Sequence, residues 1–406
     1  MYNSQLRLFS VAIRWRAERL SRTERKGREL KVSPTFGRKA VSVVCAATLC
    51  LGAGGLLAGC AGNAQQDASS ASQQQAAQNE TRIFTDSLGR QVEVPANIER
   101  IAPSGSISQQ VLMTVAGDKL VGLSGGPSES QEKYFGDKYS GMDEFGTIVG
   151  GKGDFNKEAV AAADAQIVID IGQPKDGLGE DLDTLQQQIG IPCIHVSTTL
   201  DTFGDAYRML GDLLGVQDKA EELATYCDRV YQEMSEFAAS IPEDERVTVA
   251  YLQGDTGLQA MPKGSYHSVI TDMVANNVVV LENGAKVSGA GSETSLEQIA
   301  LWDPELIIFG PKSVYDTVGD NPAWQSLSAI QSGNYYQIPN TPYDWMNRPP
   351  SVNQLLGLQW LPRICYPDKF DDDMYEVVSG YYKLFYDYDM SQADFDELMA
   401  KAMPQD

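Results

Sequence analysis

The sequence predicts an α/β protein with two doubly wound lobes joined by one long linker helix. Two observations carry this prediction: predicted strands and helices alternate along both halves of the 406-residue chain, and an apolar stripe with helical spacing separates the halves. Short connections between alternating strands and helices indicate parallel sheets with right-handed crossovers. We therefore expect an N-terminal lobe at 81–215, the helix at 216–241, and a C-terminal lobe at 242–406.

The linker helix is predicted by apolar residues spaced alternately three and four apart. They are Ala220, Leu223, Cys227, Val230, Met234, Phe237 and Ile241. This spacing places them on one face of a helix, and Gly215 and Pro242 stand at its ends as helix boundaries should. The alternative is a coiled-coil strand, but the stripe covers little more than three heptads. A helix at 216–241 would be about 39 Å long and, having no internal Pro or Gly, would allow only a small closure of the lobes.

Residues 1–60 predict an exported lipoprotein. Arg38 and Lys39 precede an apolar run rich in small residues at 40–59, which is typical of a signal peptide. The run ends in Leu57-Ala58-Gly59-Cys60, which resembles a bacterial lipobox, so we expect acylated Cys60 to anchor the protein on the outer face of the cytoplasmic membrane. The alternative is a transmembrane anchor, for which the run is short and rich in Gly and Ala.

The leader at 1–59 is long, and the segment after it is polar. We hypothesise that residues 1–31 are not translated, because Val32 could be read from an alternative start codon. A mass measurement of the unprocessed precursor tests this. Residues 61–80 contain no aromatic or branched aliphatic side chain, so with Cys60 they are expected to form a flexible tether.

Charge and cysteine content narrow the function classes. The chain carries a net charge of −23, and because residues 1–59 carry +8, the remainder carries −31. Such a surface repels phosphates and argues against a nucleic-acid partner. Beyond Cys60 the exported part has Cys193, Cys227 and Cys365, among which spacing cannot choose a disulfide. A structural metal cluster is disfavoured because there is no C-x-x-C and only two histidines, and we expect no cofactor.

The N-terminal lobe is expected to open with a hairpin. Strands at 82–86 and 90–94 flank a turn at 87–89, in which Gly89 should take a positive φ. The further elements predicted here are strands at 100–103, 120–123, 166–171 and 193–196 and helices at 107–116, 156–163 and 182–189.

The C-terminal lobe repeats the alternation. Its predicted strands are 246–252, 278–281, 306–309 and 335–338, and its predicted helices are 266–275, 295–302, 351–365, 372–386 and 391–402.

A short module occurs once in each lobe. In the first copy Asn156 stands two residues before Glu158, and in the second Ser295 stands two residues before Glu297. In both, an Asp follows six residues after the Glu and an apolar strand comes next. A capping box alone would explain Asn or Ser near Glu at a helix start, but not the same module twice.

From residue 81 to about 385 the chain resembles the class III substrate-binding proteins of ABC importers, the group that takes up ferric siderophores, haem and vitamin B12. Besides the two Glu modules, the matching pieces are Thr85-Asp86-Ser87-Leu88-Gly89-Arg90, Val92-Glu93-Val94-Pro95, Arg100-Ile101-Ala102-Pro103-Ser104, Gly190-Ile191-Pro192, and Trp360-Leu361 before Tyr366-Pro367. The resemblance departs at Ala165, where the family usually has proline. It implies a monomeric binding protein, not an enzyme, that delivers a metal complex to a membrane permease and its ATPase. It also implies that Glu158 and Glu297 dock onto arginines of that permease.

Ligands of two-lobed α/β proteins bind outside the carboxyl ends of the strands. The loops at those ends supply the candidate ligand-binding residues Ser104, Ser106, Lys152, Tyr266, His267, Tyr343, Trp345, Asn347 and Arg348. Arg348 is expected just before a helix whose first turn holds two prolines, where guanidinium and helix dipole would both favour an anion. The alternative is that it pairs with Asp344.

For three of these candidate residues a structural role is the alternative to ligand binding. Tyr343 and Trp345 could stack on a ligand or fill the core. His267 is a candidate metal ligand or an ordinary surface histidine.

The sequence is compatible with several classes of ligand as the cargo. A ferric chelate of the siderophore type is favoured, with cobalamin or haem as further candidates. The stretch from Trp345 to Ser351 also resembles family members that bind molybdate or tungstate. An exported hydrolase would need an activated nucleophile, and neither G-x-S-x-G nor HExxH occurs.

Overall fold

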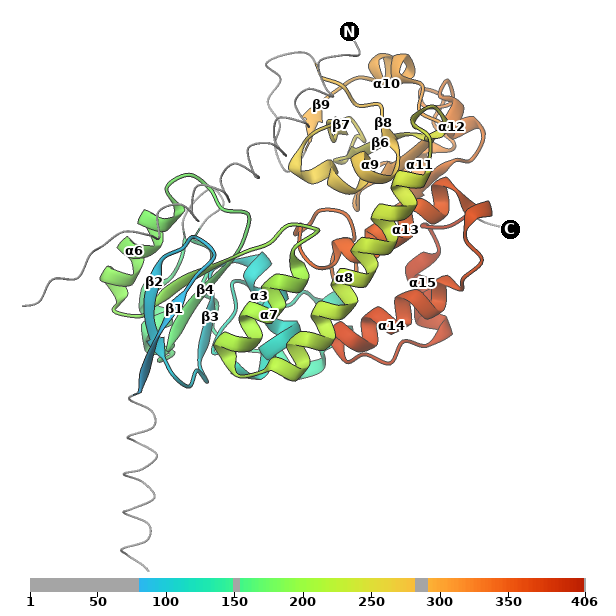
Figure 1. Ribbon diagram of the computed structural model, residues 1–406. Coiled ribbons are helices and arrows are strands. Elements are labelled where there is room, and N and C mark those ends of the chain that lie inside the picture. Colours follow the sequence, from blue (N-terminus) through green and yellow to red (C-terminus); the bar gives the residue numbers. More distant parts are fainter. Residues whose placement is uncertain (1–79, 149–153, 282–290, 405–406) are drawn as a thin grey trace, which may run out of the picture. The chain divides into compact units, whose positions relative to one another are not determined.

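The computed structural model describes residues 80–148, 154–281 and 291–404, all of which belong to one compact unit (Figure 1). Strands and helices alternate in it much as the sequence predicts, so the α/β class is confirmed. The leader, the lipobox with Cys60, most of the tether and Lys152 lie outside the described residues. None of the helices in the described part has the length and hydrophobicity that a membrane span requires.

The N-terminal lobe combines a hairpin with a parallel sheet. Strands β1 (Thr81–Thr85) and β2 (Gln91–Pro95) pair antiparallel, and Gly89 between them has φ 78°, as predicted. The sheet has the order β3-β4-β5, with β3 at Ile101–Pro103, β4 at Ile167–Gly172 and β5 at Cys193–Ser197. All six residues of β4 are buried, as expected for the central strand of a covered parallel sheet. The helices are α3 (Ser106–Ala116), α4 (Glu129–Phe135), α5 (Lys157–Ala162), α6 (Leu178–Ile189) and α7 (Phe203–Leu214).

One strand prediction for this lobe was wrong, and two of its helices, α4 and α7, were not predicted. The strand expected at 120–123 is reduced to two isolated bridges, from Leu120 to Ile101 and from Leu123 to Glu144. Between them the ring of Phe145 occupies the space that a side chain at position 122 would need, so this segment curves around a buried aromatic ring. Helix α7 was not predicted, although its apolar residues pack against both β5 and the helix that follows.

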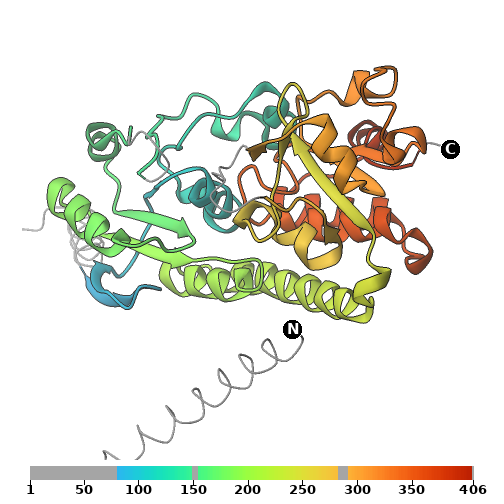
Figure 2. The same cartoon turned by 90° about the horizontal axis from the view of Figure 1, so that it is seen from above.

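The helix expected at 216–241 is observed as α8, Gln217–Ser240. It contacts α7 and α3 of the N-terminal lobe and α9 and α13 of the C-terminal lobe, and it runs along one side of both in Figure 2. Its predicted stripe is buried except for Phe237, which is partly exposed. That α8 limits the relative motion of the lobes stays a prediction.

The C-terminal lobe contains a mixed sheet of order β11-β10-β6-β7-β9, with β8 also paired to β6. Pairs among β6, β8, β10 and β11 are parallel, whereas β7 joins β6 and β9 antiparallel. The strands are β6 (Thr248–Gln253), β7 (Gln259–Ala260), β8 (Asn276–Asn277), β9 (Ser292–Glu293), β10 (Leu306–Phe309) and β11 (Tyr335–Gln337). The helices are α9 (Val269–Val274), α10 (Leu296–Trp302), α11 (Tyr315–Val318), α12 (Ser328–Gln331), α13 (Gln354–Cys365), α14 (Met374–Tyr386) and α15 (Gln392–Met399).

Two boundaries in this lobe differ from the prediction in ways that matter for the site. The strand expected at 278–281 lies earlier, at β8, because the buried amide of Asn277 donates to Asp272 and fixes the chain there. The helix expected from 351 begins only at Gln354. Residues before it fold back on the preceding loop, where Asn353 Nδ2 donates to the carbonyls of Pro349 (3.0 Å) and Asp344.

The three cysteines in the described part are free and buried. Burial raises the pKa of the Cys193 thiol to about 12 and raises the pKa of Cys227 and Cys365 as well. Thiols that resist deprotonation in this way are unreactive core residues rather than metal ligands or nucleophiles.

Candidate functional site

A cleft of about 510 Å³ lies where the two lobes face each other at the carboxyl ends of β3 and β4. The N-terminal lobe contributes Ser104–Ser108, Thr147 and the segment from Asp170 to Lys175. The C-terminal lobe contributes Tyr266, His267 and Pro350. This is the position that strand direction predicts for a ligand, and the volume is within the range of small-molecule sites.

The N-terminal face of the cleft is a connected hydrogen-bond network. Ser104 directly follows β3, is 3% exposed, and donates its hydroxyl proton to Oδ1 of Asp170. Its Oγ also lies 2.8 Å from Oγ of Ser108, which accepts a hydrogen bond from the backbone N–H of Ile171. Ser106, the first residue of α3, lines the cleft with an exposed hydroxyl. Both predicted serines, Ser104 and Ser106, therefore lie in the wall of the cleft.

Asp170 and His195 were missed by the sequence analysis. Asp170 lines the cleft, and its Oδ2 lies 2.7 Å from Nδ1 of the fully buried His195. The hairpin holds His195 in place, since Asp86 accepts its backbone N–H and the backbone N–H of Ser87 donates to its carbonyl. The available signal was a single carboxylate within the apolar strand β4, because charged residues are rarely buried without a partner.

The C-terminal face carries Tyr266 and His267 in a single 3₁₀ turn that Ser265 caps. Their rings lie edge to face with centroids 5.4 Å apart, and the Tyr266 hydroxyl reaches the Pro350 carbonyl only at 3.5 Å. Burial, and then the positive charge of Arg348, lowers the pKa of His267 below its ordinary value. A neutral imidazole can ligate a metal, and the buried Nδ1 of His267 has no hydrogen-bond partner in the described part of the chain.

His267 alone does not make a metal site. Among the described residues, no three His, Cys, Asp or Glu side chains gather closely enough to hold an ion. A role of His267 in cargo binding therefore stays a prediction.

Arg348 is exposed, and the described residues provide no ion pair to it. Among the described residues no ion pair within 4.0 Å joins Arg348 to Asp344, but the alternative is partly supported, because, against the burial that raises the pKa of Asp344, the charge and the backbone N–H of Arg348 both act to lower it. Asp344 is buried and accepts hydrogen bonds from the backbone N–H groups of Met346 and Asn347. The expectation that Arg348 directly precedes a helix was wrong, because α13 begins six residues later, and the helix dipole gives no support to anion binding there. Arg348 does not line the cleft, but Pro350, two residues later, does, and the charge of Arg348 adds to burial in lowering the pKa of His267.

The other aromatic and amide candidates do not line the cleft. Trp345 is fully buried in the hydrophobic core, and Asn347, 1% exposed, donates from Nδ2 to the Tyr251 hydroxyl at 3.1 Å. Tyr343 lines a different hollow, where its ring contacts Phe135 and Tyr386 and burial raises its pKa. None of these three side chains is positioned to contact a ligand in the cleft. Of the two roles considered for Trp345, stacking on a ligand or filling the core, its burial favours the core.

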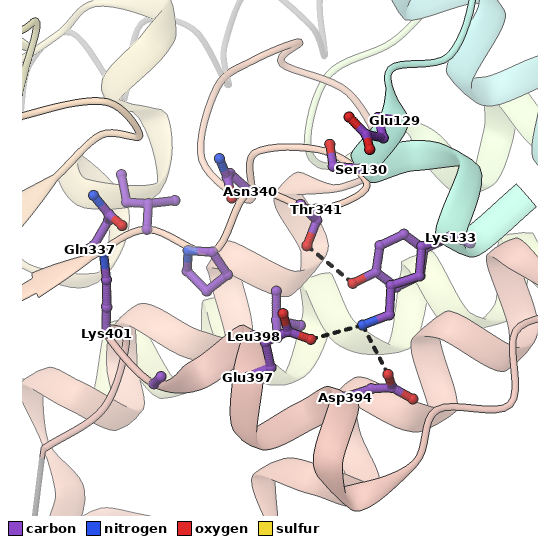
Figure 3. A pocket seen from close by; sticks show the side chains of 14 residues that line it. Glu129, Ser130, Lys133, Gln337, Asn340, Thr341, Asp394, Glu397, Leu398 and Lys401 are labelled. Carbon is purple, nitrogen blue, oxygen red and sulfur yellow. Dashed lines mark hydrogen bonds and ion pairs between the residues drawn. The ribbon is translucent and has the colours of Figure 1, made fainter.

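A second hollow of about 530 Å³ lies between α4 and α15 (Figure 3). Lys133 reaches from α4 to Asp394 (2.9 Å) and Glu397 (3.0 Å), and Tyr134 lies 3.1 Å from the Thr341 hydroxyl. The ammonium group of Lys133 is thus already neutralised by two carboxylates of the same protein. The cleft between the lobes is the better ligand site because it lies at strand ends and carries polar groups that lack partners.

The two Glu modules have the same local structure. Asn156 accepts from the backbone N–H of Ala159 at 3.0 Å, and Ser295 accepts from that of Gln298 at 3.2 Å. Each helix is followed by an Asp with positive φ, 55° in the first copy and 43° in the second. Glu158 and Glu297 are both exposed in the first turns of α5 and α10. The repeat is therefore structural, while its docking role stays a prediction.

Comparison with known proteins places this architecture in a family. A model of the family described as periplasmic binding protein matches residues 104–342, more than half of the chain. A curated relative, the Fe(3+)-citrate-binding protein YfmC of Bacillus subtilis, is 22% identical over 195 residues, which cover 47% of this chain and 58% of that protein.

Solved structures agree with the family match. An ABC transporter solute-binding protein from Sulfurospirillum deleyianum matches with a TM-score of 0.71 and 28% identity, covering 79% of this chain and 99% of that one. The molybdate-binding protein MolA of Haemophilus influenzae shares the fold at 19% identity, with a TM-score of 0.59 and coverage of 76% and 99%. The chain therefore belongs to the periplasmic binding protein family, within the class III substrate-binding group that its sequence resembles.

Proposed function

We propose that this protein is an extracytoplasmic lipoprotein, anchored through Cys60, that captures a metal complex in the cleft and delivers it to the permease of an ABC importer. The observation that carries the proposal is the cleft of about 510 Å³ at the strand ends, lined by hydroxyl, carboxylate, imidazole and phenol groups from both lobes. A metal chelate offers both donors and acceptors and has the size that such a cleft accommodates. The relative named for Fe(3+)-citrate supports a ferric chelate as the first cargo.

A bare oxyanion such as molybdate is the second candidate. The exposed cation of Arg348, two residues from the cleft-lining Pro350, and the shared fold with MolA support it. Isothermal titration of the purified protein with ferric citrate, haem, cyanocobalamin and sodium molybdate separates the two. We expect saturable binding of a chelate; saturable binding of molybdate alone would favour the second candidate, and binding of none would refute the proposal.

Delivery to a permease is tested through the two exposed glutamates. Charge pairs at an interface chiefly govern encounter and orientation, so the double variant Glu158→Ala/Glu297→Ala should keep ligand affinity and melting temperature but lose uptake and stimulation of the transporter's ATPase. The matched control is Glu180→Ala/Glu376→Ala, which removes exposed glutamates from the first turns of α6 and α14. Normal transport by the first double variant would leave Glu158 and Glu297 as ordinary helix-capping residues.

A further inference from the structure

We propose that Asp170 is a ligand-facing acceptor at the floor of the cleft, and that the cargo presents a hydrogen-bond donor to it: a hydroxyl, an amine, an amide N–H or a metal-bound water. The inference rests on the proposed function and narrows the chemistry of the cargo. It also gives a role in binding to the carboxylate of Asp170.

Asp170 is held in place by both its backbone and its side chain. It lies within the buried strand β4, and its backbone pairs with His195 on β5. The residue is 8% exposed, and it lines the cleft. A carboxylate that is nearly buried yet reaches a cavity is costly to fold unless donors stabilise it, and two donors do so here.

The Asp170 carboxylate is the acceptor in both of its side-chain hydrogen bonds. The N–H of Ile171 donates to Ser108 Oγ, so the Ser108 hydroxyl proton is free to donate to Ser104 Oγ, whose own proton goes to Asp170 Oδ1. On the other oxygen, His195 Nδ1 lies at 2.7 Å. Linked hydrogen bonds of this kind strengthen one another, so they hold the carboxylate in one orientation.

The tautomer of His195 follows from its surroundings. Nε2 is buried and has no hydrogen-bond partner among the described residues. A proton on Nε2 would therefore be a buried donor without an acceptor, whereas a proton on Nδ1 is satisfied by Asp170. His195 thus donates from Nδ1 and acts as a positioning residue, holding the carboxylate toward the cleft.

Asp170 has acceptor capacity left for a ligand. An ionised carboxylate offers about four lone-pair sites, and Ser104 and His195 occupy two. What faces the cleft is therefore an acceptor with negative charge, which favours a donor or cationic group and repels an anionic oxygen. Lys175, an exposed residue of the cleft lining, can meet an acceptor of the same molecule. A cargo that carries donors and acceptors together fits this arrangement, whereas a bare tetrahedral oxyanion has no donor for Asp170.

The test is calorimetric titration of wild type and Asp170→Asn with three probes. Ferric citrate carries hydroxyl groups and iron-bound water, cyanocobalamin carries amide N–H groups, and molybdate carries no donor at neutral pH. We expect wild type to bind one of the first two and not molybdate, and Asp170→Asn to bind that chelate at least tenfold more weakly. Asp181→Asn, which removes an exposed carboxylate from α6 of the same lobe, should bind like wild type.

The outcomes separate this inference from the proposed function. If wild type binds none of these three probes and no haem, the proposed function fails and the inference with it. If wild type binds a chelate and Asp170→Asn binds it equally or more tightly, only the inference fails. Should Asp170→Asn prove unfolded by circular dichroism, Asp170→Ser removes the same charge with a smaller side chain. Wild type that binds molybdate more tightly than either chelate overturns the inference without any variant.

Discussion

The two faces of the cleft differ in how their polar groups are held. On the N-terminal face, Ser104, Asp170 and His195 are buried and hydrogen-bonded to one another. On the C-terminal face, His267 Nδ1 has no hydrogen-bond partner among the residues that the structure describes, and Arg348, close to this face in the chain, is exposed. The first face is fixed before a ligand arrives, and the second has polar groups that a ligand can still satisfy. Preorganisation lowers the cost of binding, while the unsatisfied groups leave room to adapt to the cargo.

The largest expected effect is a difference in how much a substitution on each face of the cleft lowers the free energy of unfolding. His195→Ala removes a fully buried ring and the donor to Asp170, so we expect it to lower the free energy of unfolding by about 3–5 kcal/mol. Tyr266→Ala, on the half-buried C-terminal face, should lower it by about 1 kcal/mol. Urea denaturation of both variants measures this, and equal losses would show that the two faces are held alike.

The next effect concerns Asp344, which underlies the loop that carries Arg348. Burial raises the pKa of Asp344 from 3.8 to about 6, so the folded protein retains this proton between about pH 4 and pH 6 while the unfolded chain releases it. Its contribution to stability therefore falls as pH rises through that window, by about 3 kcal/mol in total. Asp344→Asn keeps an acceptor for the N–H groups of Met346 and Asn347 but does not titrate.

Unfolding free energies of wild type and Asp344→Asn at pH 4, 5, 6 and 7 check this. The variant should gain on wild type as pH rises. Parallel curves would mean that Asp344 is ionised at little cost and that the C-terminal face is better stabilised than its unpartnered atoms suggest.

The smallest expected effect is on affinity. If an anionic part of the cargo lies against Arg348, Arg348→Ala should weaken binding by about 1.5–3 kcal/mol with no change in melting temperature, because the side chain is exposed. Lysine should restore only part of the loss, since it lacks the planar guanidinium fork. Arg229→Ala, which removes an exposed cation from α8, is the control. Unchanged calorimetry for Arg348→Ala would remove this residue from the binding face.

The sequence was sufficient for the fold wherever local patterns decide structure. The stripe that became α8, the glycine turn at Gly89 and the module around Glu158 and Glu297 are all set by residues close in the chain. Predictions failed where side-chain contacts override the local pattern: the ring of Phe145 fills the space beside position 122, and the side chain of Asn353 bonds back to its own loop, so that α13 begins later.

The candidate site was only partly predictable for the same reason. Strand direction was enough to place Ser104, Ser106, Tyr266 and His267 at the cleft. It could not show that Trp345, in the same polar-aromatic loop as Arg348, turns into the core. Nor could it pair Asp170 with His195, because these residues meet across two strands that are joined by a helix.

Native mass spectrometry of the protein purified from its own host, with metal analysis of the same sample, tests the central claim most directly. A matched preparation carries Ser106→Trp, which places an indole in the cleft at an exposed position of α3. We predict that wild type retains an adduct with the mass of a metal chelate and that Ser106→Trp, although folded, does not. An adduct with the mass of a bare oxyanion, or one that persists in Ser106→Trp, would contradict the binding of a metal chelate in this cleft.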